Sequence, residues 1–320
     1  MSVPRILVTG CAGYIGSTLV GHLLKARCRV IGVDNLMFDN GSALLPFLGD
    51  PNFEFFNGDV TDSALMVSLV RYCDSIVPLA AIVGAPLCDR EPSLAKAVNY
   101  EAIKTIVAAA SPDQRIVYPN TNSGYGQTDG NSFVTEEDPL TPISVYGRTK
   151  CDAEKVVLDH PNSATLRLAT VFGASPRMRM DLMVNDFTGR IYALKQTGGS
   201  FSIFEPHFKR NFVGVQDVAR AFLFMLMNSW HKGAYNLGLP TANLTKMELA
   251  LRICDVLGVS REVVKVGDGK DPDQRNYLVS NDKILSAGFE FRHDLETGIR
   301  EVAQVVSLLP AEQVKKMRNI

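Results

Sequence analysis

Strand-like and helical patterns alternate through the first half of the chain. Short runs rich in Val, Ile and Leu occur at residues 5–10, 28–34, 53–59, 75–80, 115–120 and 164–169. Between them, helical patterns are predicted to begin near Tyr14, after Thr61, near Pro92 and near Val145. This alternation is typical of βαβ units, whose parallel sheet is buried on both faces. We therefore predict an α/β fold with a Rossmann-type, doubly wound parallel sheet.

The alternation weakens after Ala169, where short strand candidates are mixed with helices predicted near residues 182–195, 216–229, 245–257 and 294–309. The segments "VQDVARAFLFMLM" and "GAYNLG" are apolar enough to return to the main sheet. We therefore expect a large domain made of residues 1–168 plus about 211–237. Residues from about 169 to 210 and 238 to 320 are expected to form a smaller C-terminal lobe.

Composition and charge exclude several classes of protein. The 33 basic residues nearly balance the 34 acidic residues, so we expect no basic surface for nucleic acid. No apolar run approaches the roughly 20 residues that span a bilayer, and the first residues do not resemble a signal peptide, so a cytoplasmic protein is expected. The cysteines form no CxxC pair and lack His partners at metal spacing, which predicts reduced thiols and no structural metal.

A glycine-rich loop lies between the first predicted strand and the first predicted helix. Gly10, Gly13 and Gly16 permit a tight turn and a close approach of the backbone to a pyrophosphate at the helix N-terminus. Asp34 ends the second strand, where a carboxylate binds the ribose hydroxyls of NAD and repels a 2′-phosphate. No Arg follows Asp34 closely. The pattern predicts binding of NAD rather than NADP, although a glycine turn with a surface aspartate is the simpler alternative.

Asp59 and Val60 end the third predicted strand in "NGDVTD". They are placed to meet the adenine edge of a dinucleotide, and a helix-capping turn before "SALMVSLV" explains them about equally well. Both interpretations stay open from the sequence.

Hydrogen-bonding side chains gather at the end of the fifth predicted strand, in "YPNTNSGYG". Thr121 is expected to point into the crevice where α/β sheets bind ligands. Further along, Tyr146 and Lys150 are four residues apart, so both lie on one face of a helix. A neighbouring ammonium favours the phenolate and makes tyrosine a useful general base. Both features also have an interpretation that involves no function. The stretch around Thr121 can be an ordinary polar turn, and Tyr146 and Lys150 can be a surface pair on a helix.

With these motifs in this order, the chain resembles the extended short-chain dehydrogenase/reductases of the nucleotide-sugar epimerase and dehydratase group. The family's catalytic Ser or Thr precedes a Tyr-Gly pair by four positions and the catalytic Tyr by about twenty-five; Thr121 fits this spacing and Ser123 does not. The resemblance implies Thr121, Tyr146 and Lys150 as catalytic residues. It also implies further cofactor contacts by Tyr14, Ile15, Asn35, Leu79, Ala80, Ala81 and Asn99, and substrate contacts by Asn122, Ser123, Thr170 and Asn185.

Two arginines correspond to diphosphate-binding positions of the family. Arg210 lies in "KRNFVGVQDVARAF" and Arg275 in "DPDQRNYLVSNDK". The planar donor fork of arginine binds phosphate oxygens in pairs. For each arginine the alternative is an ordinary surface ion pair, and this alternative has more weight for Arg275 than for Arg210.

The chain also departs from some family members. Sugar 4,6-dehydratases carry an Asp-Glu pair after the catalytic threonine, where this chain has Asn122 and Ser123. Pro78 stands where relatives often have His, and Thr170 where many carry a substrate-binding Asn. The stretches "LATVFGASPRMRMDLMVNDF", "AAIVGAPLCDR" and "TNSGYG" are most similar to bacterial GDP-heptose 4-dehydrogenases of capsule synthesis.

The resemblance implies NAD-dependent oxidation of the C4 hydroxyl of a GDP- or UDP-sugar, by a 4-dehydrogenase or a 4-epimerase. An NADH-dependent keto-sugar reductase and a non-catalytic NAD-binding regulatory protein are the alternatives.

A homodimer through a four-helix bundle is expected from the helices near Pro92 and Val145, which relatives use for this contact. Simple packing of these helices on the sheet explains the same apolar runs.

Overall fold

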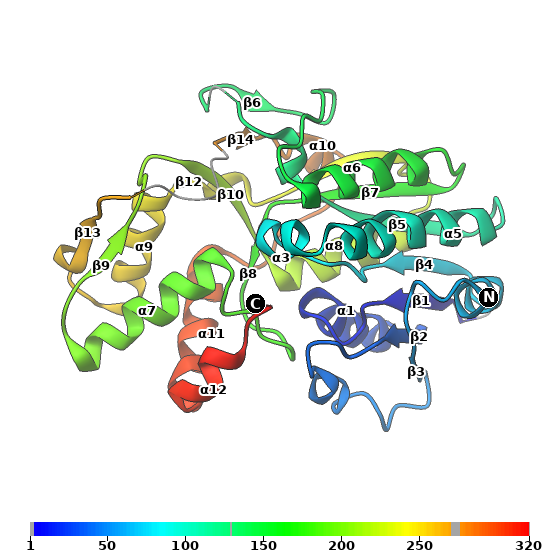
Figure 1. Cartoon of the computed structure of the whole chain (residues 1–320), viewed down its shortest axis with the longest axis horizontal. Helices are drawn as coiled ribbons and strands as arrows, with labels where there is room; N and C mark the ends of the chain where they lie inside the picture. The colour runs from blue at the N-terminus through cyan, green and yellow to red at the C-terminus, as the bar shows by residue number, and fades with distance from the viewer. Residues whose placement is uncertain (1–2, 129, 270–275, 320) are drawn as a thin grey trace.

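The computed structural model describes residues 3–128, 130–269 and 276–319 and contains a seven-stranded sheet with the order β11-β7-β5-β4-β1-β2-β3 (Figure 1). Every pairing in this sheet is parallel. The predicted Rossmann-type sheet is confirmed, and the segment "GAYNLG" does return to it as β11. The strands are β1 (Arg5–Thr9), β2 (Arg29–Asp34), β3 (Phe53–Asn57), β4 (Ser75–Pro78), β5 (Arg115–Thr121), β7 (Ser163–Leu168) and β11 (Gly233–Leu237).

Helices cover both faces of the sheet, because alternate residues of each strand point to opposite sides. In β1, Ile6 and Val8 belong to the core beneath α1 (Tyr14–Lys25) and α8 (Val215–Met227). Leu7, between them, belongs to the core beneath α2 (Ser63–Tyr72), α5 (Ala102–Ala109) and α6 (Val145–Leu158). The near-continuous apolar runs of the sequence therefore reflect burial on both sides.

The helix predicted near Pro92 is continuous but irregular. It consists of α4 (Pro92–Lys96), the π-helical turn η2 (Ala97–Glu101) and α5. The short helix α3 (Ala85–Arg90) precedes it and was not predicted. Six residues are too few to show a helical period in the sequence.

The smaller lobe is built around a three-stranded sheet of order β12-β10-β8, and α7, α9 and α11 bury a separate apolar core with it. Strand β10 runs across the predicted boundary at residue 211 and belongs to this smaller sheet, whereas α8 and β11 pack with the large one. The division into domains stays a prediction. The remaining elements are η1 (Gly41–Leu44), η3 (Asn122–Tyr125), β6 (Phe133–Val134), β8 (Thr170–Phe172), α7 (Met183–Thr197), β9 (Phe201–Ile203), β10 (Lys209–Gly214), η4 (Pro240–Ala242), β12 (Asn243–Thr245), α9 (Lys246–Leu257), η5 (Arg261–Val263), β13 (Val264–Val266), β14 (Leu278–Val279), α10 (Asp282–Ser286), α11 (Leu295–Leu308) and α12 (Ala311–Lys316).

Among the residues that the structure describes, none of the helices has the length and apolar character needed to cross a bilayer.

Candidate active site

A cavity of about 1130 Å³ lies at the carboxyl-terminal ends of the central strands and extends to the smaller lobe. Parallel α/β sheets bind ligands at this edge. The cavity brings together most of the predicted site residues, from the first glycine loop to β10. These residues are Gly10, Gly13, Tyr14, Ile15, Gly16, Asp34, Asn35, Asp59, Val60, Leu79, Ala80, Ala81, Thr121, Ser123, Tyr146, Lys150, Thr170 and Arg210.

Three predicted contact residues are buried behind the cavity wall rather than on it. The Asn99 amide donates to the carbonyl of Ile82 at 2.9 Å and accepts from the Ile82 N–H at 2.8 Å, so it holds a segment that lines the cavity. Asn185 similarly accepts from the Gly173 N–H at 3.0 Å. Asn122 is fully buried, and its amide has no hydrogen-bond partner among the described residues. The predicted contact by Arg275 lies outside the described residues.

The glycine loop lies so close to neighbouring backbone atoms that Gly10 and Gly16 have no room for a side chain. Gly10 adopts φ +69°, and a Cβ there would lie 2.7 Å from the backbone nitrogen of Ala80. A Cβ on Gly16 would lie 2.1 Å from the carbonyl oxygen of Gly10. Helix α1 begins directly after Gly13, so its first N–H groups face the cavity edge with no capping side chain before them. This loop fits a pyrophosphate, which the N–H groups and the helix dipole stabilise.

Asp34 is held at the cavity by backbone donors. Its two carboxylate oxygens accept from the N–H groups of Ala12 at 3.0 Å and Leu36 at 2.9 Å. Burial raises the pKa of the Asp34 carboxyl, whereas these hydrogen bonds and the Asn40 amide oppose the shift. A fixed carboxylate in this position fits the ribose hydroxyls of NAD, which are hydrogen-bond donors.

Asp59 combines features of both sequence interpretations. Its carboxylate accepts from the Thr61 N–H at 2.8 Å and from the Asn35 amide at 2.8 Å, and it lines the cavity with Asn35. The cap of α2 itself is Asp62, whose carboxylate accepts from Ala64 and Leu65. Asp59 therefore shapes a turn at the cavity, and its contact with adenine stays a prediction.

The polar cluster of the fifth strand reaches the cavity next to α6. Thr121 is the last residue of β5, and its hydroxyl donates to the Ser123 hydroxyl at 2.9 Å and accepts from the Ser123 N–H at 3.1 Å. Helix α6 begins after Ser144, whose hydroxyl caps the Gly147 N–H. The first turn of α6 thus presents Tyr146 to the same cavity as Thr121 and Ser123.

Lys150 is 3% exposed and lies one helical turn after Tyr146. Its ammonium is 4.1 Å from the centroid of the Tyr118 ring. Burial lowers the pKa of Lys150 to about 7, while the nearby Cys151, Glu154 and Cys88 oppose this shift. Burial also raises the pKa of Tyr118, which therefore stays a neutral phenol under the lysine. A charge on Lys150 stabilises an anion placed beside it, because the buried surroundings have a low dielectric constant.

Replacing Lys150 by Met is expected to raise the free energy of unfolding near neutral pH. The folded-state pKa of about 7 lies below the ordinary value of 10.5, so between these values the unfolded chain binds more protons than the folded one. The stability of the wild type therefore rises with pH in this window, by up to about 1.4 kcal/mol per unit. Urea unfolding at pH 7 and pH 10 should show the advantage of Lys150→Met shrinking with pH; a constant difference would contradict the buried, titrating lysine.

A buried polar network ties α6 to β5 beneath the cavity. Glu154, 2% exposed, accepts from the Asn120 amide at 2.6 Å and forms an ion pair with Arg167 at 2.8 Å. Asn120 in turn accepts from the Thr121 N–H at 2.8 Å. This network was not predicted from the sequence, although Glu154 lies four residues after Lys150 and hence on the same buried helix face. A charged residue on a helix face that is expected to be buried needs a polar partner, and this was the sequence signal that could have indicated the network.

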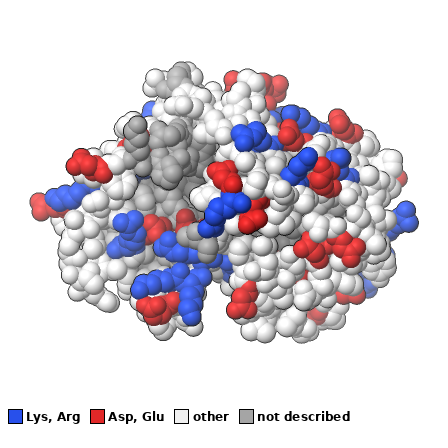
Figure 2. Space-filling view, in the orientation of Figure 1, with Lys and Arg blue, Asp and Glu red and all other residues white. Residues whose placement is uncertain are grey.

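The part of the cavity next to the smaller lobe is rich in arginine. Arg210 is 1% exposed and its guanidinium lies 5.7 Å from the Tyr277 ring centroid. Arg177 and Arg179 also line the cavity, and Arg179 forms an ion pair with Asp181. Figure 2 shows Lys and Arg side chains gathered around the C-terminal end of the chain and α12. These cations suit an anionic ligand at this end.

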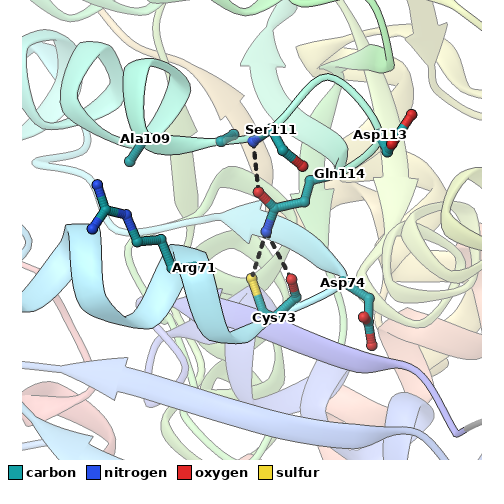
Figure 3. Close-up of a pocket in the computed structure, with 8 residues that line it drawn as sticks. Arg71, Cys73, Asp74, Ala109, Ser111, Asp113 and Gln114 are labelled. Carbon is teal, nitrogen blue, oxygen red and sulfur yellow. Dashed lines mark hydrogen bonds between the residues drawn. The ribbon is translucent and has the colours of Figure 1, made fainter.

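A second hollow, of about 610 Å³, lies at the opposite, amino-terminal edge of the sheet (Figure 3). Here the Gln114 amide donates to the carbonyls of Val70 at 2.6 Å and Cys73 at 2.7 Å, and accepts from the Ser111 N–H at 2.7 Å. These bonds join the ends of α2 and α5, whose last carbonyls lack partners within the helix. The polar groups of Gln114 thus serve the fold, and the predicted catalytic residues lie at the other edge.

The strand order, the glycine loop and Asp34 together define a dinucleotide-binding α/β protein, and Tyr146 and Lys150 on one helix beside Thr121 are typical of the short-chain dehydrogenase/reductase class. The chain belongs to the NAD-dependent epimerase/dehydratase family, whose sequence model matches residues 6–238. NAD is therefore the cofactor, and structural neighbours are crystallised with NAD bound.

Relatives with different activities are similar to this chain over nearly its whole length. UDP-glucuronic acid decarboxylase 6 of Arabidopsis thaliana is 30% identical, with 92% of this chain and 86% of the relative covered. The low-salt glycan biosynthesis protein Agl12 of Haloferax volcanii is 27% identical, with coverage of 92% and 96%. The structure of the dTDP-glucose 4,6-dehydratase DesIV of Streptomyces venezuelae, solved with NAD, superimposes with a TM-score of 0.80 at 25% identity, with coverage of 93% and 95%.

Proposed function

We propose that the protein oxidises the C4 hydroxyl of a nucleotide-linked sugar. The observation that carries this proposal is one cavity wall that combines Thr121, Tyr146 and Lys150 with the glycine loop and Asp34. Bound NAD supplies the hydride acceptor. The remaining chemistry is the removal of one proton from the C4 hydroxyl, which the chain's own side chains perform.

Tyr146 is the proposed general base. As a phenolate it accepts the C4 hydroxyl proton, and the Thr121 hydroxyl shares that proton in a hydrogen bond. The charged form of Lys150 favours the phenolate over the phenol, and burial of Lys150 strengthens this effect because little water screens it. Tyr118 does not compete as a base, since burial raises its pKa.

The fate of the 4-keto sugar distinguishes two enzymes with the same residues. If the ketone turns over and takes the hydride back, the protein is a 4-epimerase; if the ketone leaves, it is a 4-dehydrogenase. We propose a GDP- or UDP-sugar as substrate, with GDP-heptose of capsule synthesis as the specific candidate. Arg210, buried on the cavity wall, supports a diphosphate-linked ligand, and Arg275 is proposed to join it.

The proposal includes a cytoplasmic homodimer. Helices α5 and α6 lie side by side on one face of the sheet (Figure 1). Their exposed sides carry charges such as Lys104 and Lys155. The same pair from a second copy would complete a four-helix bundle. Sedimentation velocity tests the dimer, and a monomer at micromolar concentration would exclude it.

Incubation with UDP-, GDP-, CDP- and dTDP-sugars is expected to yield a 4-keto sugar or a C4 epimer, with no loss of water. Elimination needs an acid and a base beside the sugar, and Asn122 and Ser123 exchange no protons near neutral pH. The cavity carboxylates Asp181 and Asp186 form ion pairs with Arg179 and Arg318.

Mass spectrometry of the separated products tests whether the sugar loses water, with Tyr146→Phe as the inactive control. Efficient dehydration would contradict the C4-only mechanism and direct attention to Asp181 or Asp186. Absence of turnover with every nucleotide sugar, despite NAD binding, would favour the non-catalytic alternative.

A further inference from the structure

The connection from β8 to α7 leaves the smaller lobe and docks onto the first turn of α1. The Tyr14 hydroxyl donates to the carbonyl of Gly173 at 2.7 Å. The Ser175 hydroxyl donates to the Tyr14 carbonyl at 2.7 Å and lies 3.2 Å from the Ser17 hydroxyl. Residues 173–175 are therefore fastened to the helix that follows the glycine loop, although they are far from it in sequence.

These contacts place Arg177 at the cofactor end of the cavity. Its N–H donates to the Ser175 hydroxyl at 3.3 Å, and its guanidinium donates to the carbonyls of Met178 at 3.0 Å and Arg318 at 3.3 Å. The guanidinium also lies 5.7 Å from the Phe38 ring centroid. Arg177 and Phe38 both line the cavity.

Arg177 shares this end of the cavity with Asp34. The charge of Arg177 is close enough to lower the pKa of the Asp34 carboxyl against the effect of burial. Burial also lowers the pKa of Arg177, and Arg179 adds to this. Within the described part of the chain, its guanidinium hydrogen-bonds only to the two backbone carbonyls, which leaves donors for an anion.

We propose that Arg177 is a cofactor-binding residue, which the smaller lobe places against the adenosine diphosphate part of NAD next to Asp34. A guanidinium binds phosphate oxygens and packs on aromatic rings, and both partners are available at this position. Arg177 is also the cation that would hold a 2′-phosphate once the Asp34 carboxylate is removed. Asp34 and Arg177 together then determine which dinucleotide binds.

The inference depends on the cofactor and not on the sugar or the C4 chemistry. Binding of NAD to the protein freed of nucleotide therefore tests it, whatever the outcome of the sugar experiments. Conversely, a protein that binds NAD through Arg177 but oxidises no sugar would refute the proposed function alone.

The Arg177→Gln variant is expected to bind NAD roughly tenfold or more weakly than the wild type in isothermal titration calorimetry, because a charge-assisted contact is lost. Arg190→Gln, on the exposed side of α7 and outside the cavity, is the control and keeps wild-type affinity. Arg177→Lys keeps the charge without the planar fork and should give intermediate affinity. Circular dichroism and thermal melting confirm the fold of each variant. Wild-type NAD affinity in folded Arg177→Gln would overturn the proposal.

A double-mutant cycle with NADP tests the position beside Asp34. Asp34→Asn should bind NADP more tightly than the wild type, since it removes a like charge from the 2′-phosphate. This gain should be smaller when Arg177→Gln is also present, because the cation that would hold the 2′-phosphate is then absent. A gain of the same size in the double variant would show that another group holds the 2′-phosphate and would overturn the placement of Arg177.

Discussion

The Tyr146→Phe variant is expected to lose turnover by roughly 100- to 10,000-fold, the usual effect of removing a positioned general base. The change deletes one oxygen and leaves the aromatic ring that packs in the first turn of α6. NAD should still bind, because the glycine loop and Asp34 are untouched. Single-turnover formation of NADH, measured by absorbance with a saturating nucleotide sugar, checks the result, and calorimetry checks NAD binding.

Two hydroxyl variants serve as the comparison. Thr121→Ala should be less severe than Tyr146→Phe, since it removes a proton-sharing partner and not the base. Ser123→Ala should be milder still, although its hydroxyl accepts from Thr121 at 2.9 Å and therefore orients that group. If Ser123→Ala is the most damaging of the three variants, the roles assigned to Thr121 and Ser123 are wrong.

The Glu154→Gln variant should lower the free energy of unfolding by about 3–5 kcal/mol, because it leaves the Arg167 guanidinium buried without its counterion. Both side chains of this ion pair are almost fully buried, so water cannot replace the lost carboxylate. Burial by itself lowers the pKa of Arg167, and its bonds to Glu154 raise it overall, so the change removes the interaction that offsets the burial of this cation. A guanidinium stays protonated in proteins, so the variant holds a buried charge without its partner. Urea unfolding monitored by fluorescence measures the difference.

Asp152→Asn on the same helix is the matched control. Asp152 pairs with Lys155 at 2.9 Å on the exposed face of α6, where an ion pair contributes about 0–1 kcal/mol. Folded Glu154→Gln should also turn over more slowly, since Asn120 positions the Thr121 backbone and loses its anionic acceptor. Equal unfolding free energies for the two variants would show that the buried pair contributes nothing to stability.

The sequence by itself determined the parts of this protein that depend on neighbours along the chain. Alternating apolar runs and helical patterns are local signals, and they predicted the parallel sheet and the return of β11. The glycine loop is also local, since Gly10 and Gly13 lie between β1 and α1 and Gly16 lies in the first turn of α1. The spacing of Tyr146 and Lys150 is local for the same reason, because residues four apart share a helix face.

Only the tertiary structure decided which distant side chains meet. Asn99 and Asn185 are hydrogen-bonded to the backbone behind the cavity wall, which no periodicity indicated. Arg177 is distant from Asp34 in sequence, and it reaches the cofactor end because residues 173–175 dock on α1. Glu154 holds Asn120 through a contact between a helix and a strand. The direction of each such side chain follows from how whole elements pack, and local sequence patterns do not specify that packing.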